Sequence, residues 1–146
     1  MFRIACFVLA AALAVAAHAE SPAPAPLIRP AGDTDLPEFL WLARPVVVFA
    51  DSPEDPLFLQ QMELLAEGED RLADRDVVVL FDTDPAAKAP LRQRLRPRGF
   101  MMVLIGKDGE VELRKPRPWT VREITRSIDK MPNRIREVEE RREKAG

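Results

Sequence analysis

Three short apolar runs constrain the fold of this chain more than any other feature: Val46–Ala50, Val77–Phe81 and Met101–Ile105. None of the runs alternates apolar with polar residues, and charged residues or proline stand around them. Such runs are typical of central strands that are covered on both faces. The sequence therefore predicts an α/β fold with a sheet between helices.

The segments between and after these runs predict the remaining elements. Apolar residues at helical spacing predict a helix from Pro56 to about Leu72, between the first two runs. A short basic helical turn is expected at residues 90–96, before the third run. The Asp-Gly pair in residues 106–109 favours a hairpin turn. The alternating residues 110–114 then predict a half-exposed strand antiparallel to the third run.

Two further helices are expected at the ends of the domain. One begins at Asp35, which can act as its cap, and ends before Arg44 and Pro45. The other begins at the capping box Thr120–Glu123 and ends at Pro132. A helix-joined parallel pair of strands followed by an antiparallel hairpin and a closing helix is the thioredoxin core. We therefore expect a thioredoxin-like α/β fold, with a central mixed sheet of about four strands flanked by helices.

The N-terminal residues predict export. Residues 1–19 combine a short basic start, an apolar stretch and the sequence Ala17-His18-Ala19, which together are typical of a cleaved secretory signal peptide. Residues 20–34 are rich in Pro and Ala and predict an extended, mobile leader. The thioredoxin-like domain is expected at residues 35–132, and a charged helical tail at 133–146. The protein is thus predicted to be periplasmic or secreted, without a stable membrane anchor after cleavage.

The composition excludes several kinds of chemistry. The single Cys and the single His, Cys6 and His18, both lie in the predicted signal peptide. The exported chain would therefore have no thiolate nucleophile, no disulfide and no imidazole base. Thiol-disulfide oxidoreductase and peroxidase activities are not expected, nor is any cofactor. Acidic residues slightly outnumber basic ones, 24 to 22, which gives no support to nucleic acid as a partner.

Four segments in the same order resemble a known family: RPVVVFADSPEDP, RDVVVL, LIGKDGEVELR and IDKMPNR. They are similar to an uncharacterised thioredoxin-like domain that occurs alone in secreted bacterial proteins. In animals the domain occurs beside sushi repeats or in coiled-coil matrix proteins, where it is described as peroxiredoxin-like. The resemblance covers residues 36–134 and implies a secreted thioredoxin-fold module for interaction. It supplies no catalytic residue.

The candidate site residues follow from the expected topology, because ligands of open α/β sheets collect beyond the carboxyl ends of parallel strands. The turn after the first run is the segment 51–55, called the elbow below. The two-cysteine motif of thioredoxins would fall near Pro53–Leu57, and its facing cis-proline near Met101. Trp119 follows a basic, proline-rich segment and suits either protein recognition or packing under the last helix. The candidate binding residues are Asp51, Ser52, Glu54, Asp55, Asp82, Asp84, Met101 and Trp119.

Two functions remain open. The first is an exported binding or accessory module with a protein or peptide partner, acting as a monomer or weak oligomer. The alternative is a divalent-metal-binding protein or metal-dependent hydrolase, because carboxylates are ligands that Ca²⁺ and Mg²⁺ favour. Its ligands would be Asp51, Asp55, Asp82 and Asp84. The same residues also suit structural roles, with Asp55 capping the helix at Pro56 and with Asp82 and Asp84 forming turns before Pro85.

Overall fold

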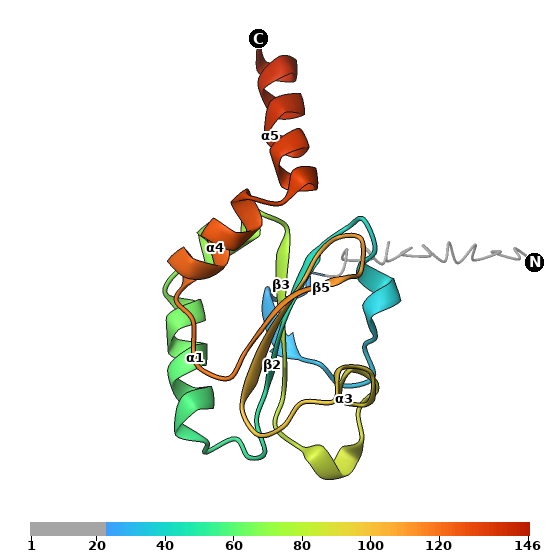
Figure 1. The fold of residues 1–146 in the computed structure, drawn as a ribbon, viewed down its shortest axis with the longest axis vertical. Helices are drawn as coiled ribbons and strands as arrows, with labels where there is room; N and C mark the ends of the chain where they lie inside the picture. The colour runs from blue at the N-terminus through green and yellow to red at the C-terminus, as the bar shows by residue number, and fades with distance from the viewer. Residues whose placement is uncertain (1–22) are drawn as a thin grey trace, which may run out of the picture.

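The computed structural model describes residues 23–146. Its centre is a five-stranded sheet in the order β1-β3-β2-β4-β5 (Figure 1). The first three strands in this order are mutually parallel, whereas β4 and β5 run antiparallel to their neighbours. The strands are β1 (Ile28–Pro30), β2 (Arg44–Phe49), β3 (Val77–Asp82), β4 (Met101–Ile105) and β5 (Val111–Lys115).

Helices cover both faces of this sheet, which confirms the predicted α/β architecture. One face packs against α1, α2 and α4 through a core cluster that includes Leu65, Leu72 and Ile124. The other face packs against η1 and α3 through a second cluster that includes Phe39 and Leu91. The helical elements are η1 (Leu36–Phe39), α1 (Pro56–Ala66), α2 (Glu69–Ala73), η2 (Pro85–Ala87), α3 (Pro90–Leu95), α4 (Val121–Asp129) and α5 (Pro132–Ala145).

The three apolar runs form central strands, as predicted. Alternate residues of β2 belong to opposite clusters: Val46 and Val48 pack on one face, and Val47 on the other. A strand with helices on both faces has no side that faces water, and this explains the absence of polar alternation in its sequence.

The strand β1 corrects the predicted boundary of the leader at residue 34. The N–H of Ala31 donates to the carbonyl of Phe81 at 2.9 Å, and the N–H of Val79 donates to the carbonyl of Leu27 at 2.8 Å. Ala31 is buried and Leu27 packs against the core. The expectation of a mobile leader was therefore wrong for residues 27–31, and the sheet has five strands rather than about four.

The helix predicted from Pro56 to about Leu72 is two helices, α1 and α2, with a break at Gly68. A Cβ atom on Gly68 would lie 2.7 Å from Cγ1 of Val121, the first residue of α4. The absence of a side chain at Gly68 thus lets α4 approach the break closely. Apolar side chains on both sides of the break still reach the same core cluster, which is why the apolar spacing suggested one helix.

The base of α5 is fixed to the domain by buried charges. The side chain of Arg44, at the start of β2, is fully buried and donates from Nη2 to Oε1 of Glu137 at 2.9 Å. Lys107 in the β4–β5 hairpin contacts the same carboxylate at 2.8 Å. Burial opposes ionisation of Glu137, but the hydrogen bonds and charges of Arg44 and Lys107 outweigh it and lower its pKa from 4.5 to about 2.

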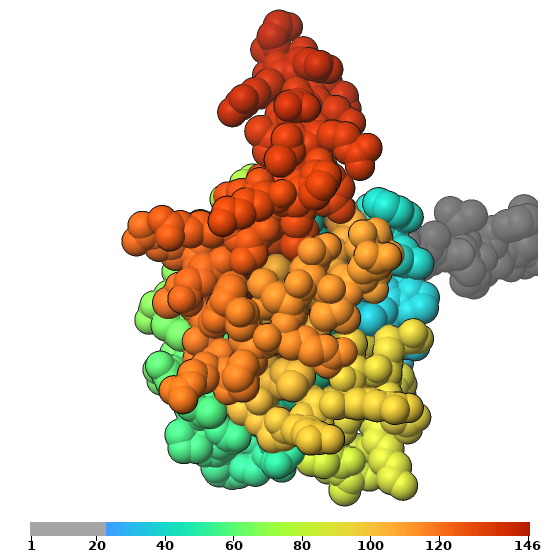
Figure 2. Space-filling model, in the orientation of Figure 1, coloured from blue at the N-terminus to red at the C-terminus, as the bar shows by residue number. Residues whose placement is uncertain are grey.

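Beyond this anchor, α5 projects away from the body of the domain (Figure 1). Figure 2 shows the same projection with all atoms drawn. The tail is helical, as predicted, but its first turns form part of the domain through Arg134, which is also buried and contacts Asp74 at 3.3 Å. No helix within residues 23–146 has both the length and the apolar character required to cross a membrane. The predicted signal peptide, residues 1–19, lies outside the described residues.

Candidate functional site

The elbow between β2 and α1 is a compact turn held by its own side chains. The hydroxyl of Ser52 accepts from the N–H of Glu54 at 3.1 Å and donates to the Glu54 carboxylate at 3.0 Å. Asp55 caps α1 by accepting from the N–H of Leu57 at 2.8 Å. Asp51 and Glu54 are exposed. The elbow therefore presents two carboxylates on a backbone that is already ordered.

The register of the sheet brings the elbow next to the segment that precedes β4. Phe49, the last residue of β2, pairs with Met101, the first residue of β4. The elbow and residues 96–100 consequently leave the sheet at the same end. Met101 is half-buried against the second core cluster, and its sulfur lies 3.7 Å from Nη1 of Arg114. Met101 thus begins β4 at the end of the sheet where the elbow lies.

An arginine joins the ends of β2 and β3. Nη2 of Arg92 donates to the carbonyls of Ala50 at 2.9 Å and Asp82 at 3.1 Å. Its Nε donates to Oδ2 of Asp82 at 3.0 Å. Both side chains of this pair are nearly buried, with 11% and 7% of their surfaces exposed. The charge of Asp82 is thus paired with that of Arg92, and this ion pair links the ends of β2 and β3. The Asp82 carboxylate is therefore not free to bind a ligand.

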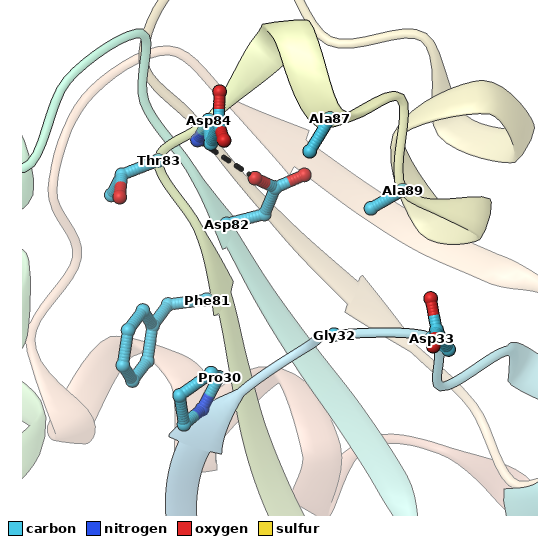
Figure 3. Close-up of a pocket in the computed structure, with 9 residues that line it drawn as sticks. All are labelled: Pro30, Gly32, Asp33, Phe81, Asp82, Thr83, Asp84, Ala87 and Ala89. Atoms are coloured by element: carbon cyan, nitrogen blue, oxygen red, sulfur yellow. Dashed lines mark hydrogen bonds between the residues drawn. The ribbon is translucent and has the colours of Figure 1, made fainter.

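Asp84 also has a structural role. Its Oδ1 accepts from the N–H of Ala86 at 3.2 Å and so caps η2. Its own N–H donates to Oδ1 of Asp82 at 2.9 Å, the bond drawn in Figure 3. Within residues 23–146, no group of three or more Asp, Glu, Cys or His side chains is arranged to hold a metal ion. The four predicted metal ligands Asp51, Asp55, Asp82 and Asp84 are accordingly not brought together as a site.

A pocket of about 280 Å³ lies beyond the ends of β1 and β3. Phe81 and Asp82 point to opposite sides of β3, and the Asp82 carboxylate is directed toward Ala87 and Ala89 (Figure 3). The sequence placed Asp82 and Asp84 at a strand end but did not predict this pocket, because one of its walls belongs to β1. The lining residues are Pro30, Gly32, Asp33, Phe81, Asp82, Thr83, Asp84, Ala87 and Ala89.

Trp119 lies far along the chain from the elbow and has a packing role. The backbone N–H of Trp119 donates to Oε1 of the buried Gln61 at 2.8 Å, and its backbone carbonyl accepts from Nε2 of Gln61 at 2.8 Å. The indole packs against the first core cluster, and Nζ of Lys115 lies 4.7 Å from the centre of the ring. Of the two roles that the sequence left open, the structure favours the contact beneath α4.

The sequence did not predict that the apolar segment after η1, residues 40–42, is exposed. Leu40, Trp41 and Leu42 are 42%, 66% and 72% exposed. Trp41 has a φ of 63°, and its N–H donates to the carbonyl of Lys107 at 2.8 Å. The sequence suggested a helix through these residues, but η1 ends at Phe39, and the left-handed backbone of Trp41 turns the side chains toward solvent. Left-handed backbone at a bulky residue has no clear sequence signal.

Comparison with known proteins places the chain in a family and a fold. Residues 35–137 match a family described as "Domain of unknown function (DUF4174)". The reduced 2-Cys peroxiredoxin of Plasmodium vivax is 18% identical, covering 64% of this chain and 80% of its own, with a TM-score of 0.51. N-terminally modified Prx1a of Plasmodium yoelii is 17% identical, covering 64% and 76%, with a TM-score of 0.50.

These structural likenesses confirm the thioredoxin-like fold and, at this level of identity, show the fold alone. The family match confirms the resemblance to an uncharacterised thioredoxin-like domain. Comparison with curated proteins found no match.

Proposed function

The chain belongs to the DUF4174 family of domains of unknown function, and from this premise we propose that it is an exported binding module without thiol chemistry. Its ligand is an extended segment of a partner protein, which binds across the elbow and the segment before Met101. One observation carries the proposal. At the sheet end where ligands of such folds collect, the chain presents an ordered elbow with exposed carboxylates and no thiol.

The order within the elbow favours binding. The bonds between Ser52 and Glu54 and the cap formed by Asp55 hold the turn in one conformation before a ligand arrives. A preorganised surface loses less conformational entropy on association than a mobile one. Leu57 and Leu59 in the first turns of α1 are 38% and 50% exposed, so apolar contact area is available beside the carboxylates.

The two sides of the proposed surface differ in charge. Asp51 and Glu54 lie on the elbow, whereas the exposed Arg96 and Arg98 lie in the segment that leads to Met101. An extended peptide between them would pair basic side chains with the elbow and acidic ones with the arginines. Such complementarity fixes the register and direction of a bound segment more than it adds affinity.

Export is part of the proposal and is supported by the sequence of residues 1–19. Cleavage after Ala19 removes Cys6 and His18, and the exported chain then has neither residue type. The N-terminal residue of protein recovered from the periplasm or the medium should be Glu20. An uncleaved chain that stays in the cytoplasm would contradict this step.

The binding proposal can be tested with purified protein and a displayed library of random linear peptides. We expect enriched peptides whose binding weakens at least about tenfold in Asp51→Lys/Glu54→Lys, since two attractive charges become repulsive. Glu140→Lys, which changes an exposed charge on α5, is the matched control and should bind like wild type. Melting temperatures establish that all three proteins are folded. Absence of enrichment, or equal binding by the elbow variant, would overturn the proposal.

A further inference from the structure

A pocket of about 380 Å³ lies between η1, α3 and the β4–β5 hairpin. None of the residues that line it belongs to the elbow or to residues 96–100. The pocket is therefore distinct from the peptide-binding surface proposed above. Its volume falls in the range of sites that hold small molecules, which are mostly apolar and carry a few well-placed polar groups.

Leucine and valine side chains form most of this pocket. Leu36 and Leu95 are buried and belong to the second core cluster, so they lie at its base. Leu40 and Val111 are exposed and lie at its rim. A Cβ atom on Gly109 would lie 2.8 Å from Cδ2 of Leu40, so the Leu40 side chain packs directly on the hairpin. An apolar ligand in the pocket would remove this exposed surface from water.

Two arginines line the same pocket, and hydrogen bonds hold their side chains in place. Nε and Nη2 of Arg94 donate to the two carboxylate oxygens of Asp35, both at 2.7 Å. Nη1 of Arg114 donates to the carbonyl of Leu95 at 2.6 Å. In the part of the chain that the structure describes, Arg94 forms an ion pair but Arg114 does not, and Nε and Nη2 of Arg114 bond no other residue. One edge of a positioned guanidinium group is thus available to a ligand.

The acidic residue of the pocket, Asp108, is bound to its own turn. Its Oδ1 accepts from the N–H of Glu110 at 3.1 Å. The Asp108 side chain is exposed, so water and salt screen its charge. The pocket therefore combines an apolar wall with the unpaired charge of Arg114.

We propose that this pocket binds a small amphiphilic carboxylate, that is, a carboxylic acid that carries a hydrocarbon chain. The two carboxylate oxygens accept from Nε and Nη2 of Arg114, because the N–H groups on this edge of a guanidinium match a carboxylate in geometry. The hydrocarbon chain lies against Leu36, Leu40 and Val111. The bond from Nη1 of Arg114 to Leu95 stays intact and fixes the guanidinium group before the ligand binds.

The charge of Arg114 makes the pocket selective for an anion. A carboxylate, an alcohol and an amine with the same chain bury the same apolar area, so the interaction with Arg114 decides between them. An ion pair at an exposed site contributes modestly, and the carboxylate should bind about fivefold more tightly than the alcohol. Asp108 repels the anion and so lowers its affinity slightly.

Amide NMR titrations of the purified protein with octanoate, octanol and octylamine test the proposal. We expect octanoate to shift the backbone amides of Gly109, Val111 and Arg114 in a saturable way, with a dissociation constant of about 1 mM or below. Octanol and octylamine should bind at least about fivefold more weakly. The amide of Ser52 should not shift, because the elbow is not part of the pocket.

Two variants with matched controls locate the carboxylate and the chain. Arg114→Gln should weaken octanoate binding at least about fivefold and leave octanol binding unchanged. Its control is Arg98→Gln, at an exposed arginine outside the pocket, which should bind both ligands like wild type. Leu40→Ala should weaken the binding of both ligands because the pocket loses part of its apolar wall. Leu57→Ala, at a similarly exposed leucine on α1, should weaken neither.

Asp108→Asn distinguishes an anion site from a cation site. Asn can still accept from the N–H of Glu110, and the variant should bind octanoate at least as tightly as wild type. Thermal unfolding establishes that Arg114→Gln is folded without its bond to Leu95, and Leu40→Ala tests the pocket with that bond intact. No saturable shift in millimolar octanoate, equal binding of octanol or octylamine, or a folded Arg114→Gln that binds octanoate like wild type would overturn the proposal.

Discussion

The carboxylate of Glu137 should fix the tail helix to the domain, and Glu137→Gln should therefore destabilise the fold. The lowering of its pKa from 4.5 to about 2 corresponds to about 3 kcal/mol of differential interaction between its protonation states. The side chain retains 22% of its surface exposed, and solvent screening reduces the expected loss to about 2 kcal/mol. Part of that loss comes from Arg44, whose fully buried charge loses its anionic partner.

Urea unfolding at pH 7 measures this loss, and a pH series tests its cause. A carboxylate whose pKa is lowered by folding stabilises the protein above the pKa of the unfolded chain and loses that effect as pH falls. The difference between wild type and Glu137→Gln should thus be complete above about pH 5 and shrink toward pH 2. Glu140→Gln, an exposed neighbour on α5, should stay within about 0.5 kcal/mol of wild type. Equal stability of the two variants at pH 7, or a difference independent of pH, would show that the ionised carboxylate of Glu137 does not stabilise the fold.

Three further variants or conditions probe the elements around the site. Arg92→Met leaves the nearly buried Asp82 carboxylate without its partner and should lower the free energy of unfolding in urea by about 3 kcal/mol. Adding Asp82→Asn should recover part of this loss. A variant as stable as wild type would show that the ion pair does not stabilise the strand ends. Gly68→Ala brings a Cβ to within 2.7 Å of Val121 and should cost about 1–3 kcal/mol; a variant as stable as wild type would show that α4 does not approach Gly68 this closely. Millimolar Ca²⁺ or Mg²⁺ should leave the melting temperature unchanged, and a rise that saturates would restore the metal-site hypothesis.

The central strands were predictable because their physical cause is local in the sequence. A strand covered on both faces must be apolar throughout, so Val46–Ala50 and the two similar runs can be recognised as central strands from their own sequences alone. The capping box at Thr120 is equally local and is present in the structure with both of its reciprocal bonds.

The elements that the sequence did not predict depend on contacts between distant residues. Ile28–Pro30 is a strand only because β3 offers a free edge to it, and three residues are too few to show a period. The break at Gly68 accommodates the close approach of Val121, which lies on another helix. Asp82 looked like a free carboxylate because its partner Arg92 is ten residues away, on α3.

The candidate site also combines features that the sequence predicted with features that it did not. The elbow and Met101 follow from the order of the elements, and the register between β2 and β4 brings them to one end of the sheet. In the structure Asp55 and Asp84 cap helices, and Asp82 forms an ion pair. The cap at Asp55 could be inferred from the neighbouring Pro56, whereas the ion pair of Asp82 could not, because Arg92 lies on α3. The proposed binding surface consequently relies on Asp51 and Glu54, the exposed carboxylates of the elbow.

Site-specific photo-crosslinking in living cells tests the central claim most directly. A photoreactive residue would replace Pro53 at the exposed tip of the elbow, with the same residue at Glu140 on α5 as the control. We expect a discrete adduct with a partner protein from position 53 only, unaffected by reductant and lost when Asp51→Lys and Glu54→Lys are added. No adduct from position 53, or the same adduct from both positions, would contradict it.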